Sequence, residues 1–153
     1  KKYIIEVKSR DGKTVSIQFE SNKVEDLLEE DHTYYYIMSG LWQYVKKHLV
    51  SSFITQLNEQ EQLEVGAAKF DFKGFALPYK TWFWGKPKTA TVPWSQIKYS
   101  LDKGVLRIQD MYDKKKKVAV SLHHDWNAVV LNTLLHYLSQ DHRKEKLEKG
   151  EKI

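Results

Sequence analysis

The sequence predicts an α+β fold in which an antiparallel meander is closed by a helix. Two observations in residues 89–138 support this prediction. The first is that apolar and polar residues alternate in three segments centred on Tyr99, Leu106 and Val120, which is the period of a half-buried strand. The second is that the apolar residues after these segments follow the repeat of one helix face: Trp126, Val129, Val130, Thr133, Leu134, Tyr137 and Leu138. Asp125 immediately precedes this face and is the expected N-cap of the helix.

The N-terminal part of the chain predicts a hairpin followed by a long helix. Apolar residues alternate in residues 3–7 and 15–19, and Asp11-Gly12 between them is a strong hairpin signal. An acidic loop with a short helical turn at residues 24–28 is expected next. Residues 34–62 then show a helical pattern, and Gly40 is a candidate for its true start. Its mostly apolar stripe consists of Leu41, Tyr44, Val45, His48, Leu49, Ser52, Phe53, Gln56 and Leu57.

The middle of the chain predicts further strands. Residues 70–77 indicate a hairpin that turns at Lys73-Gly74, and Trp82 and Trp84 are expected in the next strand. Residues 93–96, Pro-Trp-Ser-Gln, indicate a bend inside a long strand. The highly charged residues 141–153 predict a fraying helix end or a disordered tail. The expected division is a hairpin plus helix over 1–62, a domain over 63–140 and a charged tail over 141–153.

Composition restricts the class of protein. The chain has 153 residues, and 13% of them are aromatic, a fraction that a disordered chain would lack. The absence of cysteine excludes disulfides and thiolate metal sites. The formal net charge of +5 permits an anionic partner without requiring one. No membrane span or signal peptide is visible, and the start at Lys1 suggests a piece of a longer protein.

The chain also shows an internal similarity. Residues 3–28 and residues 105–130 both read as a hairpin, a Val-x-Ile or Val-x-Val strand and then a helical stretch. We therefore expect the last strands and helix of one unit, followed by a complete second unit.

The second unit resembles bacterial pleckstrin-homology-like (PH-like) domains, with YcxB-like and related uncharacterised groups as the nearest. The resemblance covers residues 63–138 and is carried by Phe-x-Phe-x-Gly-Phe at 70–75, Pro-Trp-Ser-Gln-Ile at 93–97, Gly-Val-Leu-Arg-Ile at 104–108 and Asp-Trp-Asn at 125–127. It implies a bent antiparallel sheet or open barrel capped by the C-terminal helix. It also implies that a phosphoinositide site, where present, lies in a basic loop between the first two strands. That loop is expected at Lys73-Gly74, whose single lysine argues against such a site.

Two groups of residues are candidates for binding. The first is the only basic run of the chain, which has the composition to attract an anionic lipid surface or nucleic acid, or to serve as a solvated turn. The second is an aromatic stretch with neighbouring lysines, which could stack on bases, pack in the core or meet a partner. The two groups contain Lys114, Lys115, Lys116 and Lys117, and Trp82, Trp84, Lys86 and Lys88.

Nothing in the sequence indicates catalysis. Nucleophile motifs, glycine-rich phosphate loops and paired-histidine metal spacings are absent, and the acidic run at 29–31 is contiguous and loop-like. We therefore expect a non-enzymatic binding or scaffolding module without cofactor or metal. Its expected partner is a protein or an anionic membrane surface on the cytoplasmic side, with a homodimer as a further expectation. The alternative is a basic, aromatic nucleic-acid-binding domain, whose affinity would depend strongly on salt.

Overall fold

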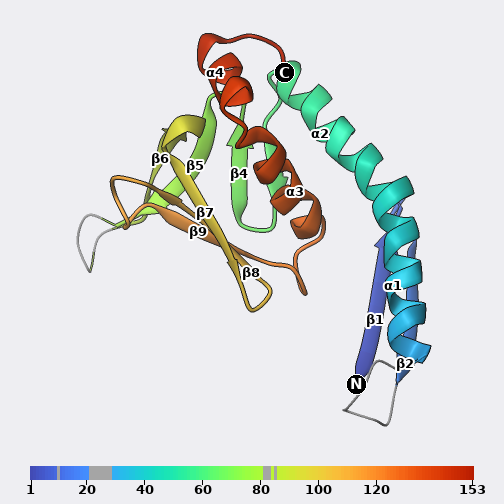
Figure 1. Cartoon of the computed structure of the whole chain (residues 1–153). Coiled ribbons are helices and arrows are strands. Elements are labelled where there is room, and N and C mark those ends of the chain that lie inside the picture. The colour runs from blue at the N-terminus through green and yellow to red at the C-terminus, as the bar shows by residue number, and fades with distance from the viewer. Residues whose placement is uncertain (10, 21–28, 81–83, 85) are drawn as a thin grey trace. The chain divides into compact units, whose positions relative to one another are not determined.

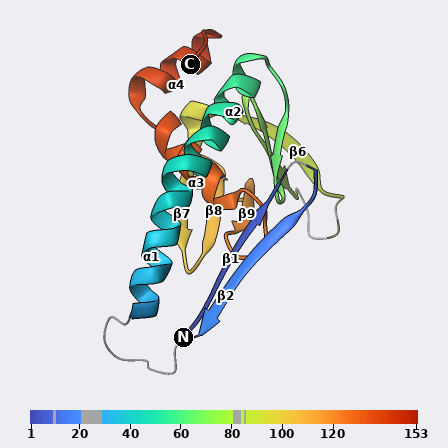
Figure 2. The same cartoon turned by 90° about the vertical axis from the view of Figure 1, so that its right-hand side faces the viewer.

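The computed structural model describes residues 1–9, 11–20, 29–80, 84 and 86–153 (Figures 1 and 2). The chain is a mixed α+β protein with several antiparallel sheets, a long helical stretch and C-terminal helices. It divides into two compact units, Lys1–Lys47 and His48–Ile153. The expected boundary after residue 62 differs from this division, because the second half of the long helix packs into the core of the second unit.

Unit 1 contains the predicted N-terminal hairpin. β1 (Lys2–Lys8) pairs antiparallel with β2 (Thr14–Glu20), and Ile5 lies opposite Ile17. The turn is closed by hydrogen bonds from Ser9 N–H to Lys13 C=O (2.8 Å) and from Gly12 N–H to Ser9 C=O (3.0 Å). Gly12 has a positive φ of 88°, a conformation that glycine adopts without steric cost. The short helical turn expected at residues 24–28 lies outside the described residues.

A buried carboxylate ties this hairpin to the helix that follows. Asp31, in α1 (Glu29–Leu41), accepts hydrogen bonds from the Lys1 ammonium (3.1 Å) and from the Tyr3 hydroxyl. The Tyr3 ring stacks on Phe19 and contacts Tyr34, with centroid distances of 4.9 and 5.3 Å. Because a buried charge is tolerated only when it is paired, Asp31 fixes the hairpin against α1.

The long helix forms, but its start and its face differ from the prediction. It begins at Glu29, passes through a π-helical segment at Trp42–Lys46 and continues as α2 (Lys47–Asn58). Within the predicted stripe, Phe53 and Leu57 are buried, whereas Tyr44 and Val45 are exposed. The π-helical segment changes the phase of the helix, so one continuous 3.6-residue stripe does not describe its two halves.

Unit 2 contains two antiparallel sheets. The first has the strand order β3-β4-β5-β6 and the second has the order β7-β8-β9. The chain bends between them at a short 3₁₀ turn, Trp94–Gln96, which matches the bend expected at 93–96. The described strands do not close into a barrel. Their bounds are Leu63–Val65, Ala68–Asp71, Gly74–Tyr79, Lys88–Pro93, Ile97–Asp102, Val105–Asp110 and Lys117–Ser121.

The core of unit 2 centres on an aromatic cluster. Phe70 and Phe75 lie opposite each other in β4 and β5 and stack with a centroid distance of 5.0 Å. Trp94 meets both rings edge-on, at 6.0 and 4.9 Å, and Phe53 of α2 approaches Phe70 at 6.4 Å. The Trp94 indole N–H donates to the Asp71 C=O (3.0 Å), so its polar edge is satisfied inside the core.

The helix after β9 begins later than predicted. α3 spans Ala128–Leu138, and its N-cap is Asn127, which has a φ of 65°. Asp125 does not cap the helix, because its carboxylate accepts the Ser121 N–H (2.7 Å) instead. Trp126 precedes α3, so the buried face is shifted from the predicted one. This face consists of Ala128, Val130, Leu131, Leu134, Leu135 and Leu138.

The charged C-terminal segment forms a further helix, α4 (Asp141–Lys149), that packs on unit 2. Leu147 is buried in the core. Gly150 ends the helix with a φ of 74°, and hydrogen bonds from Gly150 N–H to Leu147 C=O and from Glu151 N–H to Lys146 C=O form a Schellman motif. The Asn58 side chain then exchanges two hydrogen bonds with the Ile153 backbone (2.8 and 3.3 Å).

This packing predicts that the charged segment contributes to stability. We expect Leu147→Ala to lower the free energy of unfolding by about 2–5 kcal/mol, as large-to-small changes in cores do. Leu101→Ala is the control, because Leu101 is exposed on β7 and its truncation should change stability by less than about 0.5 kcal/mol. Urea unfolding followed by tryptophan fluorescence measures the free energy of unfolding of both variants. If Leu147→Ala lowered it as little as Leu101→Ala does, the packing of α4 would be contradicted.

Candidate functional site

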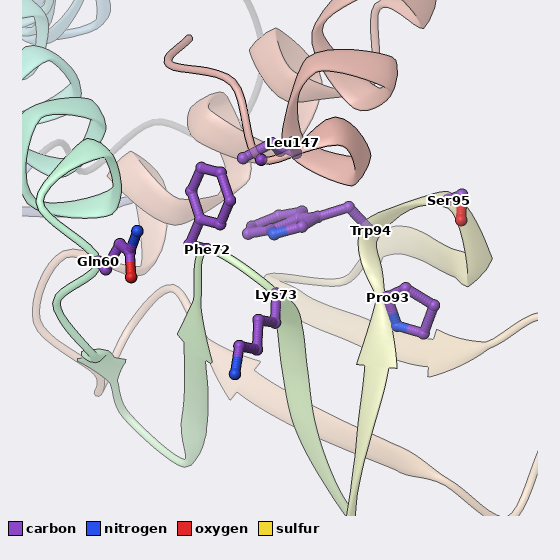
Figure 3. A pocket seen from close by; sticks show the side chains of 8 residues that line it. Gln60, Phe72, Lys73, Pro93, Trp94, Ser95 and Leu147 are labelled. Carbon is purple, nitrogen blue, oxygen red and sulfur yellow. The ribbon is translucent and has the colours of Figure 1, made fainter.

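Unit 2 has a hollow at its surface near α4 (Figure 3). Its volume is about 510 Å³. Trp94, Phe72 and Leu147 form an apolar wall, and the other lining residues are Gln60, Lys73, Pro93, Ser95 and Gly150. The Lys73 and Ser95 side chains point away from the aromatic wall in Figure 3. The hollow therefore lacks the converging polar groups of a catalytic or specific small-molecule site.

The stronger candidate is the opposite end of the β5 and β6 strands. β5 ends at Tyr79, which pairs with Lys88 at the start of β6, and the connection between β8 and β9 lies at the same end (Figure 1). The Lys116 ammonium is 6.0 Å from the centroid of the Tyr79 ring, which joins the two connections. We call this region the basic end: Tyr79, Lys80, Trp84, Lys86, Lys88, Met111, Tyr112, Lys114, Lys115, Lys116 and Lys117.

A buried aspartate organises the β8–β9 connection. Asp110 is the last residue of β8, and its carboxylate accepts the Tyr112 N–H (2.8 Å) and lies 3.3 Å from the Lys116 ammonium. The Tyr112 N–H, together with the Lys116 ammonium, holds the pKa of Asp110 below its ordinary value, although burial raises it. Asp110 therefore stays ionised and fixes the turn that presents the neighbouring side chains.

Two further contacts hold this connection. The Asp113 carboxylate accepts the Lys115 N–H (3.0 Å), and the Met111 N–H donates to the Gln96 C=O (2.8 Å) in the bend between the sheets. The turn is thus anchored to the bend between the two sheets of unit 2. Its outward side chains are presented by a fixed backbone.

The basic end exposes large apolar side chains beside its lysines. Trp84 is 85% exposed, Tyr112 is 81% exposed and Met111 is 51% exposed. Lys86, Lys88, Lys114, Lys115 and Lys117 are also exposed. Exposed aromatics and methionine flanked by cations are typical of surfaces that bind a partner or a membrane interface.

The structure brings together two groups of predicted site residues that are about thirty positions apart in the sequence. Trp84 lies in a turn, so the strand expected through it is wrong at this residue, and Trp82 lies outside the described residues. Lys116 is half-buried in ion pairs with Asp110 and Asp113 and organises the turn rather than facing outward. The sequence patterns did not indicate Met111 and Tyr112 as members of this surface. Their position in the sequence could have indicated them, because Met111 and Tyr112 come just before the lysine run.

The loop expected to hold a phosphoinositide site is also placed differently. Lys73-Gly74 connects β4 and β5, the second and third strands of the first sheet. The first two strands, β3 and β4, are joined at Gly66-Ala67, which contains no lysine. Asp71 accepts the Lys73 N–H (2.7 Å) to close its own turn.

The described part of the chain contains neither a candidate metal site nor a candidate membrane-spanning helix. No cluster of three or more His, Asp or Glu side chains there could hold a metal ion. No helix in the same residues is long and apolar enough to cross a membrane.

Comparisons with known proteins found no matching family model, no similar curated protein and no similar solved structure.

The role of Asp110 predicts a pH-dependent effect on stability. We expect Asp110→Asn to lower the free energy of unfolding at neutral pH by about 1–3 kcal/mol, because a buried ion pair and a charge-assisted hydrogen bond are lost. The folded-state pKa is lowered, so this stabilisation is present above the ordinary carboxyl pKa and is lost as pH falls through the lowered value.

The measurement is urea unfolding of both proteins at about pH 7 and at about pH 3, below the ordinary carboxyl pKa. The difference in stability between wild type and Asp110→Asn should shrink at the acid pH. Asp102→Asn serves as the control, because Asp102 forms an exposed ion pair with Arg107 (3.4 Å) that should contribute less than about 1 kcal/mol. A difference that is unchanged between the two pH values would contradict the role of the Asp110 charge.

Proposed function

We propose that this chain is a non-catalytic module that docks on an anionic membrane surface through the basic end of unit 2. The observation that carries the proposal is the exposure of Trp84, Tyr112 and Met111 among lysines at a single end of the domain. Each lysine near an anionic membrane surface contributes about 1 kcal/mol of attraction, and aromatic rings favour the interface between headgroups and acyl chains. The two effects act together only when both kinds of side chain face the same plane.

The proposal includes a PH-like architecture for unit 2. Four antiparallel strands, a bend at Trp94–Gln96, three antiparallel strands and a helix follow one another in the order that the resemblance implies. Most residues of the basic end lie in connections between strands, where side chains can change without disturbing the core. We place the module on the cytoplasmic side of a membrane, where anionic lipids are exposed.

Nucleic acid is the second candidate, and the form of the surface favours lipid over it. Single-strand binders stack bases on aromatic rings that line a basic groove. Here the exposed aromatic residues Trp84 and Tyr112 lie in turns at the end of the strands. Met111 can enter an acyl layer but offers no aromatic face to a base. An oligonucleotide competitor distinguishes the two candidates.

The charge contribution is tested by neutralising the exposed tip of the turn. We expect the Lys114→Gln/Lys115→Gln double variant to bind anionic vesicles up to about 30-fold more weakly, corresponding to about 2 kcal/mol. The matched control is Lys73→Gln/Lys103→Gln, which removes the same charge from turns at the opposite ends of β5 and β8. Co-sedimentation with anionic and neutral vesicles at low and physiological salt measures the binding. Equal loss in both double variants would show attraction by net charge alone.

The apolar contribution is tested separately. We expect Trp84→Ala/Tyr112→Ala to weaken binding to anionic vesicles at physiological salt, where screening reduces the electrostatic part. Leu101→Ala, which truncates an exposed apolar residue elsewhere in unit 2, should leave binding unchanged. The blue shift of tryptophan fluorescence on vesicle addition gives an independent readout. Unchanged binding of the double variant, or binding to an oligonucleotide but not to vesicles, would contradict membrane docking.

A further inference from the structure

The N-terminal hairpin carries an apolar face on only one of its sides. The register places Tyr3 opposite Phe19, Ile5 opposite Ile17 and Val7 opposite Val15, so six apolar side chains share one face. The other face carries mainly charged and polar residues. A two-stranded sheet with one apolar face is marginal in water unless something covers that face.

The covering of this face is uneven. On the β1 side, Tyr3 packs against Tyr34 and bonds to Asp31 of α1, and Ile5 is buried. On the β2 side, Val15 is 62% exposed and Ile17 is 39% exposed.

Unit 2 provides a matched comparison within the same chain. Its β9 carries Val118 and Val120 at the corresponding positions before a helix, and these residues are 7% and 0% exposed. The strand that follows the hairpin turn in unit 1 therefore lacks the covering that its counterpart has.

β2 also has an outer edge that no described strand pairs with. The Ser9 N–H donates to the Lys13 C=O, and hydrogen-bonded pairs alternate along an antiparallel ladder. It follows that Ile5–Ile17 is a hydrogen-bonded pair, and that the N–H and C=O groups of Ser16 and Gln18 point away from β1. These groups are available to another strand.

The sequence of β2 is complementary to itself. When two copies of Thr14–Glu20 are paired antiparallel about Ile17, all positions of the strand are matched. Val15 then lies opposite Phe19, Ser16 opposite Gln18 and Thr14 opposite Glu20. Apolar side chains meet apolar ones, no like charges are opposed, and Ser16 and Gln18 form the hydrogen-bonded pairs.

The other edge of the hairpin does not have this property. Antiparallel pairing of two copies of β1 about Ile5 would oppose Lys2 with Lys8 and Ile4 with Glu6. Like charges directly opposite each other destabilise a sheet. Pairing is therefore directed to β2, and a single self-complementary edge closes a two-fold dimer rather than a fibre.

We propose that β2 is the dimerisation edge of this chain and that its partner is β2 of a second copy, paired antiparallel about Ile17. The four-stranded sheet formed in this way joins the Val15 and Ile17 side chains of both copies on one face. This proposal does not depend on the membrane function of unit 2.

The test of geometry uses the absence of native cysteine in this chain. In the proposed dimer the two Ile17 residues form a non-hydrogen-bonded pair with a Cα separation of about 4.5 Å, within the range of about 4.4–6.8 Å that a disulfide spans. We expect Ile17→Cys to give a disulfide-linked dimer on mild oxidation of the 153-residue chain. The control is Ile4→Cys, an exposed position on the other face of β1, which should stay monomeric on non-reducing gels.

The test of association uses sedimentation velocity over a range of protein concentrations. We expect wild type to dimerise reversibly, and Ile17→Lys to raise the dimer dissociation constant by about tenfold or more, because two ammonium groups meet at the two-fold axis. Ile4→Lys should leave the dissociation constant unchanged, and circular dichroism checks that both variants fold. A wild-type chain that stays monomeric, a dimer unaffected by Ile17→Lys, or equal crosslinking of the two cysteine variants would overturn the proposal.

Discussion

The packing of Trp94 against Phe70 and Phe75, at the bend between the two sheets of unit 2, is the interaction on which the rest of that unit depends. The indole fills the corner where the chain leaves β6 and enters β7, and it contacts the stacked pair Phe70–Phe75. Its N–H donates to the Asp71 C=O. A hydrogen bond therefore fixes the corner to the β4–β5 turn, in addition to the packing of the aromatic rings. Beside this corner Gly74 allows β5 to approach β6 closely, since a Cβ there would lie 2.0 Å from the Val92 carbonyl oxygen. Burial of three large aromatic side chains stabilises the corner by several kcal/mol, at roughly 1.5–3 kcal/mol for each one.

The sequence predicted the local elements well where a strand or turn is determined by its own residues. The period-two patterns located β1, β2 and β7 to β9, and Asp11-Gly12 located the turn between β1 and β2. The prediction failed where a side chain has a choice of partners that are distant in sequence. Asp125 has the composition of an N-cap, but in the fold its carboxylate bonds to Ser121 and lies against Gly66, where a Cβ would be only 2.6 Å from the carboxyl carbon. The tight β3–β4 turn makes that arrangement possible, and no pattern around residue 125 contains it.

The residues of the basic end could likewise be predicted only in part from the sequence. The lysine run and the tryptophan stretch are each visible in the sequence, but their neighbourhood depends on two sheets meeting at the bend after β6. The residue that fixes the turn, Asp110, is acidic and buried, so a search for basic residues passes over it. Its ion pair with Lys116 removes one cation from the outward surface and orients the others. The role of a lysine within the run therefore follows from its partner, and composition assigns all four the same role.

The internal similarity between β1-β2-α1 and β8-β9-α3 gives the two units a common order of elements with different burial. In unit 2 the hairpin is part of a three-stranded sheet, and the valines of β9 lie in the core together with residues of β4 and β5. In unit 1 the described sheet has two strands, and the corresponding residues of β2 face solvent.

The two units therefore share a local structure because a hairpin and the helix after it are determined by residues that are close in sequence. Burial depends on which other strands pack against the hairpin. No described strand pairs with the outer edge of β2, and its apolar face is partly exposed. The arrangement of outward N–H and C=O groups at Ser16 and Gln18 makes that edge specific in register. An uncovered face alone would be a site of unspecific aggregation, whereas a self-complementary edge with one favoured register selects a single partner.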